Sequence, residues 1–142
     1  MKTPNWTKAE MAILRDGIRG GKDRREIADS LDRSYGSVCD KLLKEAGTRL
    51  TQCIRSGDTA SRFGGDEFGA VLSNLGNVGD ASIVAQKIID ALAQPFDLDG
   101  HETYVSASVG ITLFPSDSEE AGALIMNADT AMFRAKEQGR NT

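Results

Sequence analysis

The chain of 142 residues has few of the residue types that bind zinc or form disulfides, with two cysteines and one histidine. Cys39 and Cys53 form no CxxC pair, and His101 alone completes neither a zinc site nor a catalytic triad. No apolar run approaches the roughly eighteen residues of a membrane helix, and no apolar core of a secretory signal is present. These absences argue against disulfide-rich, zinc-bound and membrane-spanning classes. They predict a globular cytoplasmic chain.

Charge is unevenly spread along the chain. The formal net charge is −4. Residues 1–41 carry nine Lys or Arg against seven Asp or Glu, whereas residues 42–142 carry eight against fourteen. Such a split indicates that the two parts have different origins.

The first third of the chain has the pattern of three helices. Thr7 and Glu10 have the spacing of a capping box, a second short helix starts near Asp23, and Ser34 is placed to cap a third. The third helix continues well beyond the length of a small trihelical module. Its apolar residues recur at four-residue spacing, at Val38, Leu42, Ala46, Leu50 and Ile54.

The apolar period changes to two after the third helix. Residues 59–63 and 68–72 predict two strands of a hairpin, joined through residues 64–67. A helix over residues 80–94 follows, and Pro95 closes it.

The last part of the chain predicts a second hairpin and a long helix. Residues 99–100 are Asp-Gly, a common hairpin turn, and residues 105–113 alternate as a strand. Ser116 and Glu119 have the spacing of a capping pair for the final helix, and Gly139 is its expected end. The expected fold class is therefore α/β: three N-terminal helices, the third continuous with two β-hairpins and two further helices.

Asp66 and Glu67 stand side by side at the tip of the first hairpin, directly after Gly64 and Gly65. Two carboxylates at a glycine-built tip suit Mg²⁺ and nucleotide phosphates, because Mg²⁺ prefers hard oxygen ligands. The alternative is that both carboxylates are solvated turn residues.

Four motifs in order resemble one family. GGDEF at residues 64–68 is the signature of the diguanylate cyclases, which condense two GTP into cyclic di-GMP. RSGD at residues 55–58 resembles the family's RxxD inhibitory site, VSASVGIT at 105–112 its SxG strand, and ADTAMFRAKEQGRN at 128–141 its terminal helix. About residues 40–142 therefore resemble a GGDEF domain that lacks its N-terminal half.

The resemblance implies an active site around the hairpin tip. Asp66 would coordinate metal and help to activate a 3′-hydroxyl, and Glu67 would complete the metal site. The residues that would approach the nucleotide and its phosphates are Gly64, Gly65, Lys136 and Arg140. A cationic pair in the last turn of a helix also complements the helix dipole, which is the alternative for Lys136 and Arg140.

Arg55 and Asp58 match the inhibitory site that binds cyclic di-GMP. An arginine grips a phosphate or a guanine edge in bidentate fashion, and an aspartate accepts from the guanine amide. A local ion pair at a turn is the alternative.

Residues 1–39 are similar to a Myb- or homeodomain-like helix-turn-helix, and the splice would lie near Cys39 and Asp40, making the chain a chimera. The candidate DNA contacts are Tyr35, Ser37, Lys41 and Arg33. A charge of +2 on this segment supports little phosphate binding, so the alternative is that these helices serve packing alone.

The resemblance also implies what the chain lacks. The family's first strand, with an acidic metal ligand, and its guanine-reading residues are missing, which predicts a domain without cyclase activity that binds Mg²⁺ weakly and retains cyclic di-GMP or GTP binding. The alternatives are a DNA-binding regulator that senses cyclic di-GMP, and a cyclase active only as a dimer. The lost strand leaves two open edges. We expect the strand at 68–72 either to close against residues 105–113 or to pair with a second copy in a homodimer.

Overall fold

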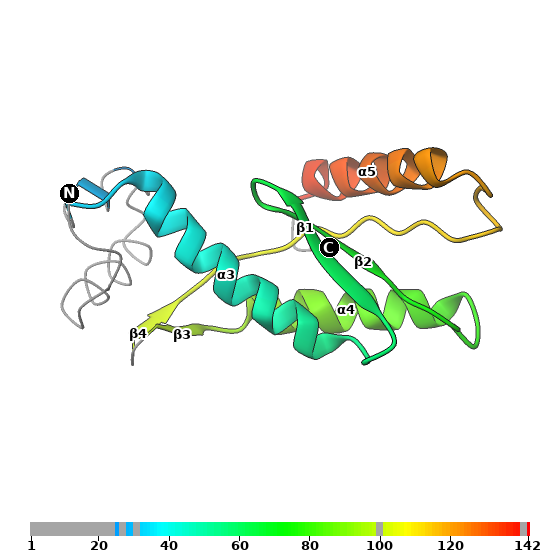
Figure 1. Cartoon of the computed structure of the whole chain (residues 1–142), viewed down its shortest axis with the longest axis horizontal. Helices are drawn as coiled ribbons and strands as arrows, with labels where there is room; N and C mark the ends of the chain where they lie inside the picture. Colours follow the sequence, from blue (N-terminus) through cyan, green and yellow to red (C-terminus); the bar gives the residue numbers. More distant parts are fainter. Residues whose placement is uncertain (1–24, 26–27, 30–31, 99–100, 140–141) are drawn as a thin grey trace. The chain divides into compact units, whose positions relative to one another are not determined.

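The computed structural model describes residues 25, 28–29, 32–98, 101–139 and 142. The chain divides into two compact units, one of residues 1–48 with 94–105 and one of residues 49–93 with 106–142. The helices and hairpins confirm an α+β chain. In chain order (Figure 1) the elements are α3 (Tyr35–Cys53), β1 (Thr59–Gly64), β2 (Glu67–Val71), α4 (Gly79–Ala93), β3 (Phe96–Leu98), β4 (His101–Thr103) and α5 (Ala121–Glu137).

The first unit shows the end of one helix and confirms the predicted start of the next. Asp32 has a positive φ of 51°, and the amides of Asp32 and Arg33 donate to the carbonyls of Asp29 (3.2 Å) and Ala28 (3.0 Å). This pair of bonds is the Schellman motif that closes a helix. Ser34 then caps α3, since its Oγ accepts from the Ser37 amide at 3.1 Å. The predicted helix from Thr7 lies outside the described residues.

The second hairpin is shorter than the alternation of its sequence indicates. β3 pairs antiparallel with β4, from Phe96 opposite Thr103 to Leu98 opposite His101. The predicted strand at 105–113 is wrong, because residues 104–113 have no strand assignment. Alternation alone does not make a strand: a ladder partner is required, and within the described ranges the two sheets contain only β1 with β2 and β3 with β4. The predicted turn at 99–100 lies outside those ranges.

In the second unit, β1 and β2 form the predicted hairpin. Thr59 lies opposite Val71 and Gly64 opposite Glu67, with an irregularity between Arg62 and Gly64. Gly69 allows the Phe63 ring to lie across it, because a Cβ at position 69 would come within 2.6 Å of the ring atom Cε2. The expected closure of this hairpin against residues 105–113 is wrong, since among the residues described β2 pairs with β1 alone.

Helix α4 supplies most of the buried apolar side chains of the second unit. Its buried residues are Ala81, Ala85, Ile88, Ile89 and Leu92. Leu50 and Cys53 on α3 are also buried. Two long cations join the helices: Arg49 Nη1 donates to the Ala91 carbonyl at 3.0 Å, and Lys87 Nζ donates to the Cys53 carbonyl at 3.0 Å. Since position 49 meets 91 and position 53 meets 87, these stretches of α3 and α4 run antiparallel.

The segment before α5 approaches that helix closely. A Cβ on Gly110 would overlap the Ala128 carbonyl oxygen and lie 2.5 Å from the Met132 nitrogen, so only glycine fits there. This is the glycine of the SxG motif. Val109 also donates its amide to the Thr142 carbonyl at 2.8 Å.

The start of α5 differs from the prediction. The cap pair of Ser116 and Glu119 is wrong, because α5 begins at Ala121 with Glu120 as its N-cap. The carboxylate of Asp117 instead accepts from the Leu113 amide at 2.8 Å, and this bond holds the residues before the helix in a turn. The helix ends as expected beside Gly139, which has a φ of +113°. Among the described helices, none has both the length and the apolar composition that crossing a membrane requires.

Candidate functional site

The turn that joins α3 to β1 is organised by one carboxylate. Asp58 Oδ2 accepts from the Arg55 amide at 2.9 Å, and Asp58 Oδ1 accepts from the Ser73 amide at 3.0 Å. The Asp58 amide in turn donates to the Arg55 carbonyl at 3.0 Å. These bonds join the turn to the residues that follow β2, 15 positions further along the chain.

Asp58 and Arg55 differ sharply in exposure. The Asp58 side chain is 4% exposed and the Arg55 side chain 65% exposed, although Arg55 Nε lies only 3.5 Å from Asp58 Oδ2. The Ser73 and Arg55 amides that donate to the carboxylate lower the pKa of Asp58, with a further contribution from the Arg55 charge. Both oxygens of Asp58 therefore accept hydrogen bonds from backbone amides of the protein itself. That Asp58 also accepts from a guanine amide stays a prediction.

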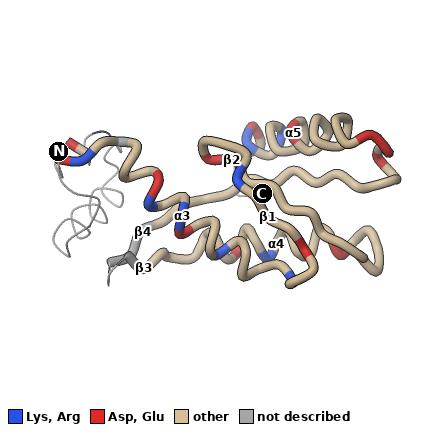
Figure 2. The backbone as a smooth tube through the Cα atoms, viewed as in Figure 1, with Lys and Arg blue, Asp and Glu red and all other residues tan. Residues whose placement is uncertain are grey.

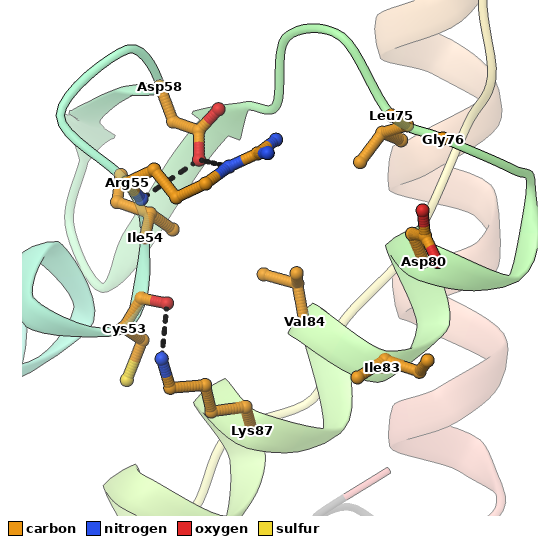
Figure 3. A pocket seen from close by; sticks show the side chains of 10 residues that line it. All are labelled: Cys53, Ile54, Arg55, Asp58, Leu75, Gly76, Asp80, Ile83, Val84 and Lys87. Carbon is orange, nitrogen blue, oxygen red and sulfur yellow. Dashed lines mark hydrogen bonds and ion pairs between the residues drawn. The ribbon is translucent and has the colours of Figure 1, made fainter.

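Arg55 lines a depression of about 300 Å³ (Figure 3). Its Nη2 donates to the Ser73 carbonyl at 2.8 Å. A guanidinium carries five N–H groups, so others are left to donate to a ligand. Apolar side chains from three segments complete the wall. The lining residues are Cys53, Ile54, Arg55, Asp58, Leu75, Gly76, Asp80, Ile83, Val84 and Lys87.

The hairpin tip is tighter than the sequence suggests. Gly64 and Glu67 pair across the strands, so the loop is only Gly65 and Asp66. Gly65 has a φ of +52°, a conformation that favours glycine, and its carbonyl accepts from Arg62 Nε at 2.8 Å. Asp66 and Glu67 are both exposed. The tip thus presents two carboxylates to solvent, one on the loop and one at the start of β2.

A second depression contains two of the residues predicted for the active site. Glu67 and Lys136 line it together, so the structure brings the hairpin tip and α5 to one place. Asp66 does not line it, and Arg140 lies outside the described residues. In the described part of the chain, no group of three or more His, Cys, Asp or Glu side chains is arranged to hold a metal.

Sequence reasoning missed several residues of both depressions. Asp129 and Phe133 line the second one, and their spacing from Lys136 along α5 places all three on one helix face, a signal that the sequence contained. Ser73, which accepts a bond from Arg55, and Lys87, which lines the first depression, carried no such signal. They are 18 and 34 residues from the positions they contact, Arg55 and Cys53.

The candidate DNA contacts are placed less favourably. Arg33 is 5% exposed, so its guanidinium is not presented to a phosphate. Ser37 and Lys41 are half-buried, and the side chain of Tyr35 lies outside the description. Acidic residues are interspersed among the basic ones along α3 (Figure 2), which lessens its attraction for a polyanion.

Comparison with known proteins assigns these motifs to a family. Residues 29–142 match the family model of the diguanylate cyclase GGDEF domain. The chain belongs to the GGDEF domain family. The match begins before residue 40, the start that the motifs suggested, so it includes Arg33, Tyr35 and Ser37 together with the whole of α3. A helix-turn-helix within residues 1–39 and a splice near Cys39 stay predictions, as does a domain boundary there.

Named relatives of this GGDEF domain include two proteins of Pseudomonas aeruginosa. The chain is 42% identical over 113 residues to the bifunctional diguanylate cyclase/cyclic di-GMP phosphodiesterase MucR, covering 79% of the chain and 16% of MucR. It is 35% identical over 119 residues to the diguanylate cyclase TpbB, covering 83% of the chain and 27% of TpbB. The GGDEF domain therefore spans less than a third of either relative.

Solved structures share the fold. The GGDEF domain of TpbB (YfiN) matches with a TM-score of 0.71 at 29% identity, over 94% of this chain and 89% of the other. An EAL/GGDEF domain protein from M. capsulatus matches with a TM-score of 0.70 at 39% identity, over 84% of this chain and 76% of the other. The α+β arrangement is thus that of known GGDEF domains.

Proposed function

We propose that this GGDEF domain binds cyclic di-GMP through Arg55 and does not synthesise it. The observation that carries the proposal is the Arg55 side chain, which is 65% exposed and lines the first depression while Asp58 and Ser73 hold its guanidinium. A guanidinium held in one orientation grips a phosphate with two parallel N–H bonds and loses little further freedom on binding.

The wall of the depression suits the rest of such a ligand. Ile54, Leu75 and Val84 contribute apolar surface beside the guanidinium (Figure 3). A nucleotide combines a charged phosphate with a flat base that buries apolar area, so cation and apolar wall are recognised together. In this proposal Asp58 does not contact the ligand. Its carboxylate orients the Arg55 side chain and the backbone of the turn.

The hairpin tip supports weak Mg²⁺ binding at most. Phosphoryl transfer depends on metal ions and charges that are held in place around the reacting phosphate. Asp66 and Glu67 are exposed, and of the two only Glu67 lines the depression that contains Lys136. Two solvated carboxylates leave most of the Mg²⁺ coordination to water. Among the described residues, Lys136 is the one cation of this depression that GTP would meet.

The decisive experiment is a calorimetric titration of cyclic di-GMP into the wild type, Arg55→Ala and Arg134→Ala. Arg134 is a matched control, because it is an exposed arginine on α5 that does not line the first depression. We expect Arg55→Ala to weaken binding at least about tenfold, the equivalent of roughly 1.4 kcal/mol, and Arg134→Ala to bind like the wild type. Absence of wild-type binding at millimolar ligand, or equal loss in both variants, would reject the proposal.

A cyclase that works only as a dimer is the second candidate. It is favoured by the shared depression of Glu67 and Lys136, and by the β1–β2 hairpin, whose outer edges have no strand partner among the described residues. A second copy that pairs with such an edge would satisfy its backbone groups and complete a site. Turnover of GTP with Mg²⁺ that rises per chain with protein concentration, and is lost in Asp66→Ala, would establish this candidate and overturn the absence of synthesis.

A further inference from the structure

The last carbonyl groups of a helix have no partner within the helix, and α3 ends directly before the turn that carries Arg55. Lys87 of α4 supplies one of the missing partners: its Nζ donates to the carbonyl of Cys53, the final residue of α3, at 3.0 Å (Figure 3). A cation at this position also complements the negative end of the helix dipole. Lys87 therefore holds the end of α3 from a different helix.

We propose that Lys87 is a positioning residue for Arg55, acting through the Cys53 carbonyl and not through contact with the ligand. The inference rests on the proposed binding of cyclic di-GMP at Arg55. In this inference the Lys87 bond fixes the backbone at the end of α3, and the position of that backbone determines the position of the Arg55 guanidinium.

The turn is held at both of its ends. Lys87 holds the upstream end at Cys53, two residues before Arg55, and the Asp58 carboxylate holds the downstream end through the Ser73 amide at 3.0 Å. The Arg55 side chain is 65% exposed, so packing does little to locate it. Its position therefore depends on its bonds to the Ser73 carbonyl and Asp58, which meet the guanidinium only when the backbone at Arg55 is in place. Loss of the upstream bond lets the end of α3 fray.

Lys87 also lines the first depression, so a direct contact with a ligand phosphate is the competing explanation. The two explanations differ in their dependence on salt. A direct ammonium–phosphate pair is screened by added salt, so removing it makes the remaining affinity less sensitive to salt. Removing a positioning bond lowers the affinity and leaves the salt dependence as it was.

Arg49 provides a matched control within the same pair of helices. Its Nη1 donates to the Ala91 carbonyl at 3.0 Å, in the last turn of α4, which makes it the reciprocal of the Lys87 bond. Arg49 does not line the first depression. Its replacement disturbs the packing of α3 on α4 without removing the bond at Cys53.

The experiment is a titration of cyclic di-GMP at several salt concentrations against the wild type, Lys87→Met, Lys87→Arg and Arg49→Met. We expect Lys87→Met to weaken binding about fivefold, roughly 1 kcal/mol, with an unchanged salt dependence. Lys87→Arg should restore most of the affinity, because arginine also donates to helix-terminal carbonyls. Arg49→Met should bind within about twofold of the wild type. A flatter salt dependence, unchanged affinity in Lys87→Met, or equal weakening in Arg49→Met would each overturn the inference.

A measurement without ligand separates this inference from the proposed function. Amide hydrogen exchange of Arg55, Asp58 and Ser73 should accelerate about tenfold in Lys87→Met and stay near the wild-type rate in Arg49→Met. If the wild type does not bind cyclic di-GMP but the exchange changes as expected, the proposed function fails and the positioning of the turn by Lys87 stands. Unchanged exchange in Lys87→Met refutes the positioning itself.

Discussion

Replacing Gly110 by alanine should be among the most damaging small substitutions in this chain. The new Cβ would overlap the Ala128 carbonyl oxygen and lie 2.5 Å from the Met132 nitrogen and 3.0 Å from the Ala128 carbonyl carbon. Ordinary Cβ contacts lie at 3.4–4 Å, so the segment at 106–113 and α5 must separate by about 1 Å, and backbone atoms do not yield as a flexible side chain does.

Overpacking of this kind costs about 2–3 kcal/mol of unfolding free energy. For a chain of this size that loss corresponds to a fall in Tm of roughly 6–12 °C. Urea unfolding followed by circular dichroism measures the change, and Gly122→Ala is the matched control. Gly122 lies in α5 with nothing within 4 Å of an added Cβ, so alanine there should raise stability by up to about 1 kcal/mol. A Gly110→Ala variant as stable as the wild type would refute the close approach of the segment to α5.

Two further substitutions test local structure. Ser34→Ala should lower the unfolding free energy by about 1 kcal/mol through loss of the cap on the Ser37 amide, whereas Ser37→Ala keeps that amide and should change little, as urea unfolding will show. Asp58→Ala should destabilise the chain at neutral pH. Because the folded pKa of Asp58 lies below its ordinary value of 3.8, the stability that it contributes is present above that value and is lost as the pH falls through the folded pKa, so the wild type and the variant should converge in acid. A difference between them that persists at the lowest pH would contradict this origin.

Local patterns in the sequence predicted most of the helix and strand boundaries because their causes are local. Ser34 caps α3, Pro95 follows α4, and the glycines at 64 and 65 produce the tight turn of the first hairpin. The strand expected at 105–113 failed for the opposite reason, since its pattern was correct but its ladder required a partner elsewhere in the fold. The cap expected at Ser116 failed because Asp117 bonds back to Leu113 and keeps the residues before α5 in a turn.

The residues of the candidate site likewise fall into those that the sequence identified and those whose roles only the structure showed. The sequence by itself determined the family motifs, and with them Arg55, Asp58, Glu67 and Lys136, because each lies within a short, ordered signature. Only the tertiary structure decided that Asp58 serves the turn while Arg55 faces solvent, and that Lys87 holds the end of α3. These roles depend on hydrogen bonds between residues 15 to 34 positions apart. No local spacing encodes such contacts, since they form only when the packing of α4 and the end of β2 bring the groups together.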